Sequence, residues 1–235
     1  MPSPRLPTVP QACIVSYPKA GRTWLRVLIG KYLCDRHGIN ERALTRTEAL
    51  TVACGLPRTM FMHGQSGFDL RIHWRELDPD RSRFSGARVV LLGRDIRDTL
   101  VSAYLWASRR LRIFDGPISA FVRDDYLGAP KLLAFYRHWH DARQVPGAFM
   151  FMRYEDLHRD PAGALARVLH FIGAPEPDEK LLAGAVAYAS FENMRRIEEQ
   201  RKLTLDFKMP EGAEQPSADP DSRKIRSGKV GGFAR

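Results

Sequence analysis

Residues 17–24, with the sequence Tyr-Pro-Lys-Ala-Gly-Arg-Thr-Trp, have the residue types of a binding site for a phosphate-like anion. A turn of small residues that leads into a helix directs backbone N–H groups at one point, and the helix dipole favours an anion there. Lys19 adds a positive charge and Thr23 adds a hydroxyl donor. The lysine precedes Gly21, whereas a Walker A loop, which holds a magnesium nucleotide, has the order Gly-Lys-Ser/Thr. On spacing alone, the segment also fits a tight connection with a surface lysine.

A second candidate anion site begins at Arg94, which follows an apolar run. An arginine at a strand end can hold a phosphate through two parallel hydrogen bonds. Ser102 lies about two helical turns further along the chain and can donate to the same group. Asp95 and Asp98 allow a simpler interpretation, in which the acids favour a helix N-terminus and the arginines are solvated.

Positive charge is concentrated in two parts of the chain. The net charge is +10, residues 71–112 contain ten arginines and five acids, and residues 223–235 contain five basic residues and no acid. Clustered cations indicate an anionic ligand, such as phosphate groups, a nucleic acid or an acidic surface. A basic surface that only keeps the protein soluble is the alternative.

These polar segments follow short apolar runs that predict β-strands, and helical periodicity comes after them. The predicted strands are residues 12–17, 59–63, 88–93 and 148–153. The predicted helices are residues 25–33, with Gly38 as the stop, 100–105, 118–127, 131–143, 161–172 and 178–188. This alternation indicates an α/β fold of three layers, α/β/α, with a central parallel sheet. Ligands of such sheets bind beyond the carboxyl ends of the strands, where residues 17–24, His63 and Arg94 are expected.

The length of 235 residues fits a single domain. The Pro-rich residues 1–11 and the polar segment 209–222 are predicted to be flexible. Cys13, Cys34 and Cys54 form no C-x-x-C pair, which argues against a zinc site or a disulfide framework and favours a cytoplasmic protein. No apolar run is long enough to span a membrane.

Residues 17–24 resemble the 5′-phosphosulfate loop of sulfotransferases that use 3′-phosphoadenosine 5′-phosphosulfate (PAPS), whose usual form is Tyr-Pro-Lys-Ser-Gly-Thr-Thr-Trp. The resemblance implies a P-loop-like phosphosulfate loop in which Lys19 stabilises the leaving 5′-phosphate. The residues implied to surround the phosphosulfate group are Lys19, Ala20, Gly21, Arg22, Thr23 and Trp24. Ala20 and Arg22 depart from the family form, because a serine and a small polar residue usually stand there.

Two later segments are similar to the 3′-phosphate motifs of the same family. Residues 94–104 resemble Arg-(Asp/Asn)-Pro-Arg-Asp-x-x-Val-Ser-x-Tyr, and residues 226–233 resemble the late Arg-Lys-Gly loop. The residues implied to hold the 3′-phosphate are Arg94, Ser102, Arg226, Ser227 and Gly228. Ser227 stands where the family often has a lysine or arginine, so one charge is missing.

Two weaker segments point to the adenine base. Residues 151–157 resemble the family's Tyr-Glu-Asp-Leu segment, and residues 189–194 resemble its Ser-Phe-x-x-Met segment. The resemblance implies that Tyr154 contacts adenine and that Phe191 stacks on it. Read alone, each aromatic residue fits a core position equally well.

His63 is the candidate general base. It ends a predicted strand on the ligand side of the sheet, and histidine titrates near neutral pH, as a base for an acceptor hydroxyl requires. Its segment resembles a Thr-His-Asp-x-Ser segment of the family, with Gly64 in place of the aspartate. His73 is the nearest rival, and a packed, structural His63 is the other alternative.

The resemblance implies a sulfotransferase that moves a sulfuryl group from PAPS to a hydroxyl, less readily an amine, of a small-molecule acceptor and releases PAP. No metal is expected, because side chains supply the cations, and no nucleic acid is expected as a partner. The acceptor loops are expected at residues 64–75, 111–127 and 202–221, while the acceptor's identity and the oligomeric state stay open. The alternatives are a P-loop nucleotide kinase, which the missing Gly-Lys-Ser/Thr order disfavours, and a basic nucleic-acid-binding module.

Overall fold

The computed structural model describes residues 10–68, 71–200, 221, 223, 225, 226 and 228–234. The predicted site residue Ser227 lies outside the described residues, as do residues 1–9 and all but Asp221 of the predicted flexible segment 209–222.

The centre of the fold is a four-stranded parallel sheet with the strand order β2-β1-β3-β4. Its strands are β1 (Ala12–Ser16), β2 (Thr59–Met62), β3 (Arg88–Gly93) and β4 (Ala148–Arg153). Every residue of β1 is buried, as a strand in the middle of a covered parallel sheet requires. Ala12 of β1 pairs with Thr59 of β2 and with Arg88 of β3, so the carboxyl ends of these three strands meet at one edge of the sheet.

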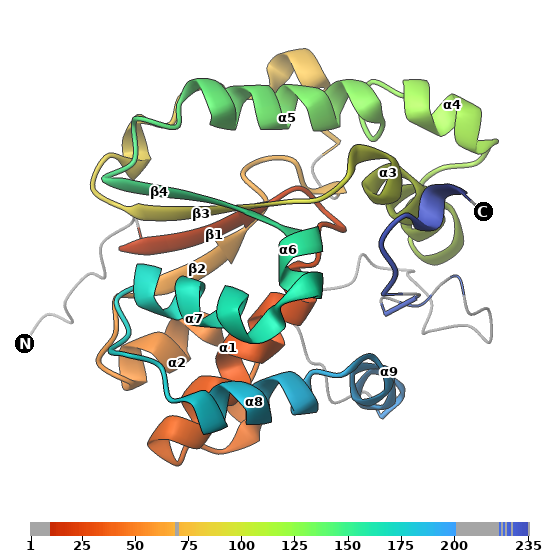
Figure 1. The fold of residues 1–235 in the computed structure, drawn as a ribbon. Helices are drawn as coiled ribbons and strands as arrows, with labels where there is room; N and C mark the ends of the chain where they lie inside the picture. The colour runs from red at the N-terminus through yellow and green to blue at the C-terminus, as the bar shows by residue number, and fades with distance from the viewer. Residues whose placement is uncertain are drawn as a thin grey trace, which may run out of the picture.

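Helices cover both faces of this sheet (Figure 1). One face carries α3 (Ile96–Leu105), the π-helical segment η5 (Trp106–Arg110), α4 (Ile118–Arg123) and α5 (Ala129–Asp141). The other face carries α1 (Arg22–His37), α2 (Thr47–Ala53), α6 (Tyr154–Arg159), α7 (Pro161–Phe171), α8 (Glu179–Tyr188) and α9 (Phe191–Glu199). Short 3-10 turns complete the described chain at η1 (Glu41–Ala43), η3 (Trp74–Glu76), η4 (Ser82–Phe84) and η7 (Gly232–Ala234).

Alternate residues of β1 divide the core into two halves. Ala12 and Ile14 pack in the cluster with α1, α7 and α8, whereas Cys13 and Val15 pack in the cluster with α3 and α5. Successive side chains of a strand point to opposite faces, so one apolar strand supports both helical layers. The predicted three-layer α/β fold with a central parallel sheet is therefore confirmed.

Helix boundaries differ from the predictions where side chains compete for the backbone. The helix predicted at 118–127 ends at Arg123, because the carboxylate of Asp124 accepts hydrogen bonds from the N–H groups of Tyr126 (2.9 Å) and Leu127 (2.8 Å). The predicted stop at Gly38 is confirmed: its φ is 64° and its N–H donates to the carbonyl of Cys34. Within the described part of the chain, no helix is both long and apolar enough to cross a membrane.

Candidate active site

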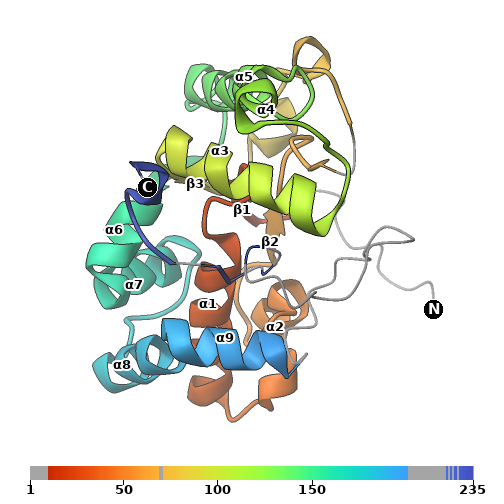
Figure 2. The same ribbon diagram turned by 90° about the vertical axis from the view of Figure 1, so that its right-hand side faces the viewer.

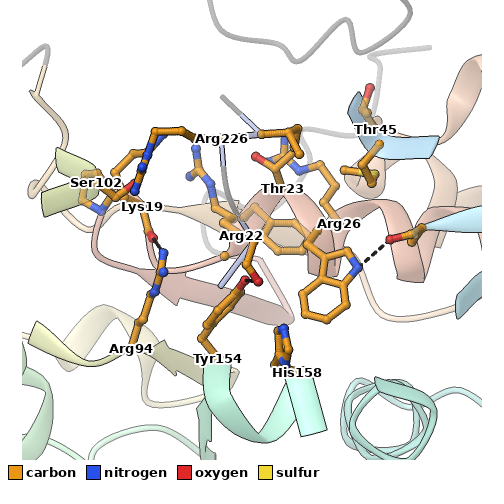
Figure 3. Close-up of a pocket in the computed structure, with 18 of the residues that line it drawn as sticks. Lys19, Arg22, Thr23, Arg26, Thr45, Arg94, Ser102, Tyr154, His158 and Arg226 are labelled. Carbon is orange, nitrogen blue, oxygen red and sulfur yellow. Dashed lines mark hydrogen bonds between the residues drawn. The ribbon is translucent and has the colours of Figure 1, made fainter. Parts of the chain in front are cut away.

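A pocket of about 840 Å³ lies at the edge of the sheet where β1, β2 and β3 end (Figure 3). It brings together nearly all of the residues predicted for the site: Lys19, Gly21, Arg22, Thr23, Trp24, His63, Arg94, Ser102, Tyr154, Phe191, Arg226 and Gly228. Ala20 is fully buried and is not among the residues that line the pocket.

The charge of the pocket is strongly positive. The described lining includes the cations Lys19, Arg22, Arg26, Arg94 and Arg226. Its carboxylate, Glu48, is paired with Arg58 at a distance of 2.6 Å between Oε1 and Nε. The site is therefore suited to a ligand with several negative charges.

The turn between β1 and α1 has the form of an anion-binding loop. Lys19 and Gly21 have φ values of 72° and 94°, which reverse the chain over a short distance. An α-helix leaves its first N–H groups without an acceptor in the helix, and Gly21 has no side chain with which to cap α1. The start of α1 thus presents backbone donors and a positive dipole end to the pocket.

Replacing Gly21 with alanine is expected to destabilise the protein by about 2–4 kcal/mol, because two costs combine. The φ of 94° is strained for any side chain, and a β-carbon at this position would overlap the ring of Tyr154. Urea denaturation of the variant and the unchanged protein measures this loss. Gly38→Ala is the control, since Gly38 has a φ of 64° but open space around the position of an added β-carbon. Equal losses in the two variants would contradict a close approach of Gly21 to Tyr154.

Lys19 lies against Trp106, with its Nζ 4.0 Å from the centre of the indole ring. Burial lowers the pKa of Lys19 to about 7; the nearby carboxylate of Glu198 opposes this shift, and the cations Arg110, Arg94 and Arg226 add to it. A lysine surrounded by other cations gains most from a bound anion, which restores its charge. These features fit a cation that stabilises negative charge on a ligand.

Arg94 connects the loop after β1 to the C-terminal tail. Its Nη1 donates to the carbonyl of Lys19 (3.2 Å), its Nη2 donates to the carbonyl of Lys229 (3.1 Å), and its guanidinium lies 4.5 Å from the centre of the Tyr154 ring. Arg94 directly follows β3, as predicted, and its hydrogen bonds join the loop after β1 to the C-terminal tail.

Asp98 has a role that the sequence interpretation missed. Its carboxylate is buried and accepts hydrogen bonds from the N–H groups of Gly231 (2.8 Å) and Phe233 (3.0 Å). Asp95, in contrast, caps α3 through the N–H groups of Arg97 and Asp98, as the simpler interpretation holds. Figure 2 shows the C-terminal residues beside α3, where Asp98 binds them. Asp98 and Gly231 are more than a hundred positions apart, so no pattern in the sequence near Asp98 indicates this contact.

Aromatic rings form one wall of the pocket. The Trp24 Nε1 donates to the carbonyl of Ala189 (2.9 Å), and its ring lies edge-on to Tyr154 at a centroid distance of 5.9 Å. The hydroxyl of Tyr154 donates to the carbonyl of Gly228 (3.3 Å), which in turn lies against Phe191. His158, which the sequence analysis did not indicate, also lies here, and the centre of its ring is 6.1 Å from the centre of the Tyr154 ring. Such a wall can hold a planar ring, such as a nucleobase.

The sequence profile of the Sulfotransferase domain matches residues 9–234 of the chain. The chain belongs to the sulfotransferase family. It is 23% identical to flavonol 3-sulfotransferase of Flaveria bidentis over 204 residues, which are 79% of this chain and 65% of that protein. It is 24% identical to cytosolic sulfotransferase 12 of Arabidopsis thaliana over 239 residues, which are 94% of this chain and 70% of that protein.

The fold is also similar to that of a solved structure, retinol dehydratase in a complex with retinol and PAP. The TM-score is 0.64 at 18% identity, over 97% of this chain and 76% of that chain. The chain spans about 65% of the length of the flavonol sulfotransferases that it matches.

The two departures from the sulfotransferase loop differ in position. Ala20 is fully buried, so the position at which the family commonly has a serine faces the core here. Arg22 is partly exposed and lines the pocket, so it adds a cation to the start of α1 rather than pointing away from the site.

His63 lines this pocket in a defined orientation. Its Nδ1 lies 2.9 Å from the carbonyl of Ser16, and because a carbonyl only accepts, Nδ1 carries the hydrogen in this contact. In the neutral ring the basic lone pair is then on Nε2. The rival His73 does not line the pocket; its Nδ1 caps η3 by accepting from the N–H of Arg75.

Proposed function

We propose that this chain binds PAPS and transfers its sulfuryl group to a hydroxyl group of a small-molecule acceptor, with PAP as the second product. The observation that carries this proposal is that one pocket contains two sets of anion-binding groups together with an aromatic wall. The first set is Lys19 with the N-terminus of α1, and the second is Arg94, Ser102 and Arg226. A nucleotide with a 5′-phosphosulfate and a 3′-phosphate carries matching charges and a planar base.

The chemistry follows from the residues at the start of α1 and the end of β2. The acceptor hydroxyl gives its proton to Nε2 of His63, and the acceptor oxygen forms a bond to sulfur. The bond between sulfur and the bridging oxygen of the 5′-phosphate breaks, and its electron pair stays on that oxygen in PAP. Lys19 stabilises the charge that develops on this oxygen, and the contact of Nδ1 of His63 with Ser16 puts the basic lone pair of the neutral ring on Nε2.

The acceptor side of the pocket favours a molecule with an apolar body. Phe68, Trp106 and Leu111 are apolar residues of the pocket lining, and the last two belong to or directly follow η5. The curated relatives that act on flavonols, by their names, fit this class of acceptor. We place the protein in the cytoplasm as part of the same proposal, since a relative over 94% of this chain is named a cytosolic sulfotransferase.

The test is a melting experiment with PAP, adenosine 5′-monophosphate and Mg-ATP. At about 100 times its Kd, PAP is expected to raise Tm by about 5–10 °C, because a ligand that binds only the folded state stabilises it. The monophosphate lacks the 3′-phosphate and is expected to give a much smaller shift at the same concentration. A shift with Mg-ATP that exceeds the shift with PAP would overturn the proposal in favour of a kinase.

A further inference from the structure

Glu198 of α9 does not line the pocket, yet its contacts lead directly into it. Its carboxylate lies 3.6 Å from Nη1 of Arg110 in η5, and both side chains are largely buried, with exposed fractions of 11% and 12%. Ion pairs at such positions are less screened by salt than pairs on the surface. The attraction between Glu198 and Arg110 beside the pocket is therefore expected to persist at physiological salt concentration.

Arg110 continues this series of contacts to the candidate catalytic lysine. Its guanidinium lies 4.8 Å from the centre of the Trp106 ring, and Nζ of Lys19 lies 4.0 Å from the same ring. Cations bind the faces of indole rings, so Trp106 is a common support for both side chains. Trp106 and Arg110 both belong to the π-helical segment η5, and π-helical turns occur frequently at functional sites.

Glu198 also binds the tail that carries Arg226. Its Oε2 accepts a hydrogen bond of 2.9 Å from the N–H of Ile225, the residue before Arg226. One carboxylate thus contacts the backbone next to one anion-binding group and, through Arg110 and Trp106, supports Lys19 in the other.

We propose that the Glu198–Arg110 pair is a positioning pair, which holds Lys19 against Trp106 and joins it to the tail segment that carries Arg226. The inference rests on the proposed function, because it concerns how the two anion-binding sets of the same pocket are kept together. Neither residue is assigned contact with the reacting groups.

The pair also has an electrostatic consequence for Lys19. Burial lowers the pKa of Lys19 to about 7; Glu198 opposes this effect, and Arg110, Arg94 and Arg226 strengthen it. Because PAP favours the protonated lysine, its affinity is expected to be highest below this pKa and to fall as the pH rises above it. Removing the charge of Glu198 should move this decline to lower pH, whereas removing the charge of Arg110 should move it to higher pH.

The experiment measures the Kd of PAP by calorimetry from about pH 6 to pH 9 for the full chain and its variants. Glu198→Gln keeps the shape of the side chain and an acceptor for Ile225, and it is expected to shift the decline down by about 0.5–1 pH unit. Arg110→Gln is expected to shift it up by a similar amount. Glu199→Gln is the matched control, because Glu199 is the next residue of α9 and pairs instead with Arg223 at 2.8 Å.

Loss of positioning is expected to weaken PAP binding at pH 6 by about threefold or more in both Glu198→Gln and Arg110→Gln, in addition to the opposite shifts of the decline, and Glu199→Gln is expected to show neither effect. The removal of a negative charge would by itself strengthen PAP binding in Glu198→Gln, so stronger or unchanged binding of PAP at pH 6 in this variant would overturn the positioning pair. If Glu198→Gln does not fold, an unchanged Kd of PAP at pH 6 in Arg110→Gln would overturn it. Failure of the unchanged protein to bind PAP at any pH would instead overturn the proposed function.

Discussion

Replacing Lys19 with methionine is expected to reduce turnover of PAPS by on the order of 100- to 1000-fold. Methionine has a similar length and can still pack against Trp106, so the change removes the charge more than the packing. The lost interaction is one that strengthens as charge develops on the leaving oxygen, and such interactions act mainly on kcat. A radiolabelled-PAPS assay over a panel of hydroxyl acceptors measures the effect.

The control for Lys19→Met is Lys180→Met, since Lys180 is exposed on α8 and does not line the pocket. The Tm of Lys19→Met without ligand is expected to stay near or above that of the unchanged protein, because a partly buried cation beside other cations is removed. Turnover within about threefold of the unchanged protein would remove Lys19 from the mechanism, since that factor is below the effect of one electrostatic stabiliser.

Replacing His63 with asparagine is expected to reduce kcat by about 100- to 10,000-fold, the usual contribution of a general base. The asparagine amide can still donate to the carbonyl of Ser16, so the strand end keeps its hydrogen bond while the basic nitrogen is lost. The rise in Tm that PAP causes is expected to be unchanged, because His63 is assigned to the acceptor and not to the nucleotide.

His73→Asn separates the two candidate bases. His73 caps η3 and lies outside the pocket lining, so this variant is expected to keep its turnover. Full activity in His63→Asn together with loss of activity in His73→Asn would transfer the role of base to His73. Loss of PAP binding in His63→Asn would show that the residue supports the nucleotide site.

Much of the fold could be predicted because its signals are local. The apolar run that forms β1 and the glycine stop at Gly38 depend on neighbouring residues alone, and the structure has both. The boundary at Arg123 was missed because the side chain of Asp124 competes with the helix for backbone donors, a choice that apolar periodicity does not report.

The sequence by itself determined the parallel type of the sheet, the order of its four strands along the chain, and the loop in which Lys19 and Gly21 stand before α1. It did not predict the helices α2, α6 and α9. What it determined follows from apolar runs within single segments and from their alternation with helical periodicity. It also indicated Arg94 and Arg226 as cations of the site, and the structure places both in the pocket with Lys19.

Only the tertiary structure decided which partners these charged residues have. Asp98 binds the backbone of Gly231 and Phe233, and Glu198 pairs with Arg110, in each case across a large separation in sequence. The physical reason is that parallel strands bring their carboxyl ends to one edge, so loops from distant parts of the chain meet there. A local pattern reports that a charge is present, but only the packed sheet sets what that charge contacts.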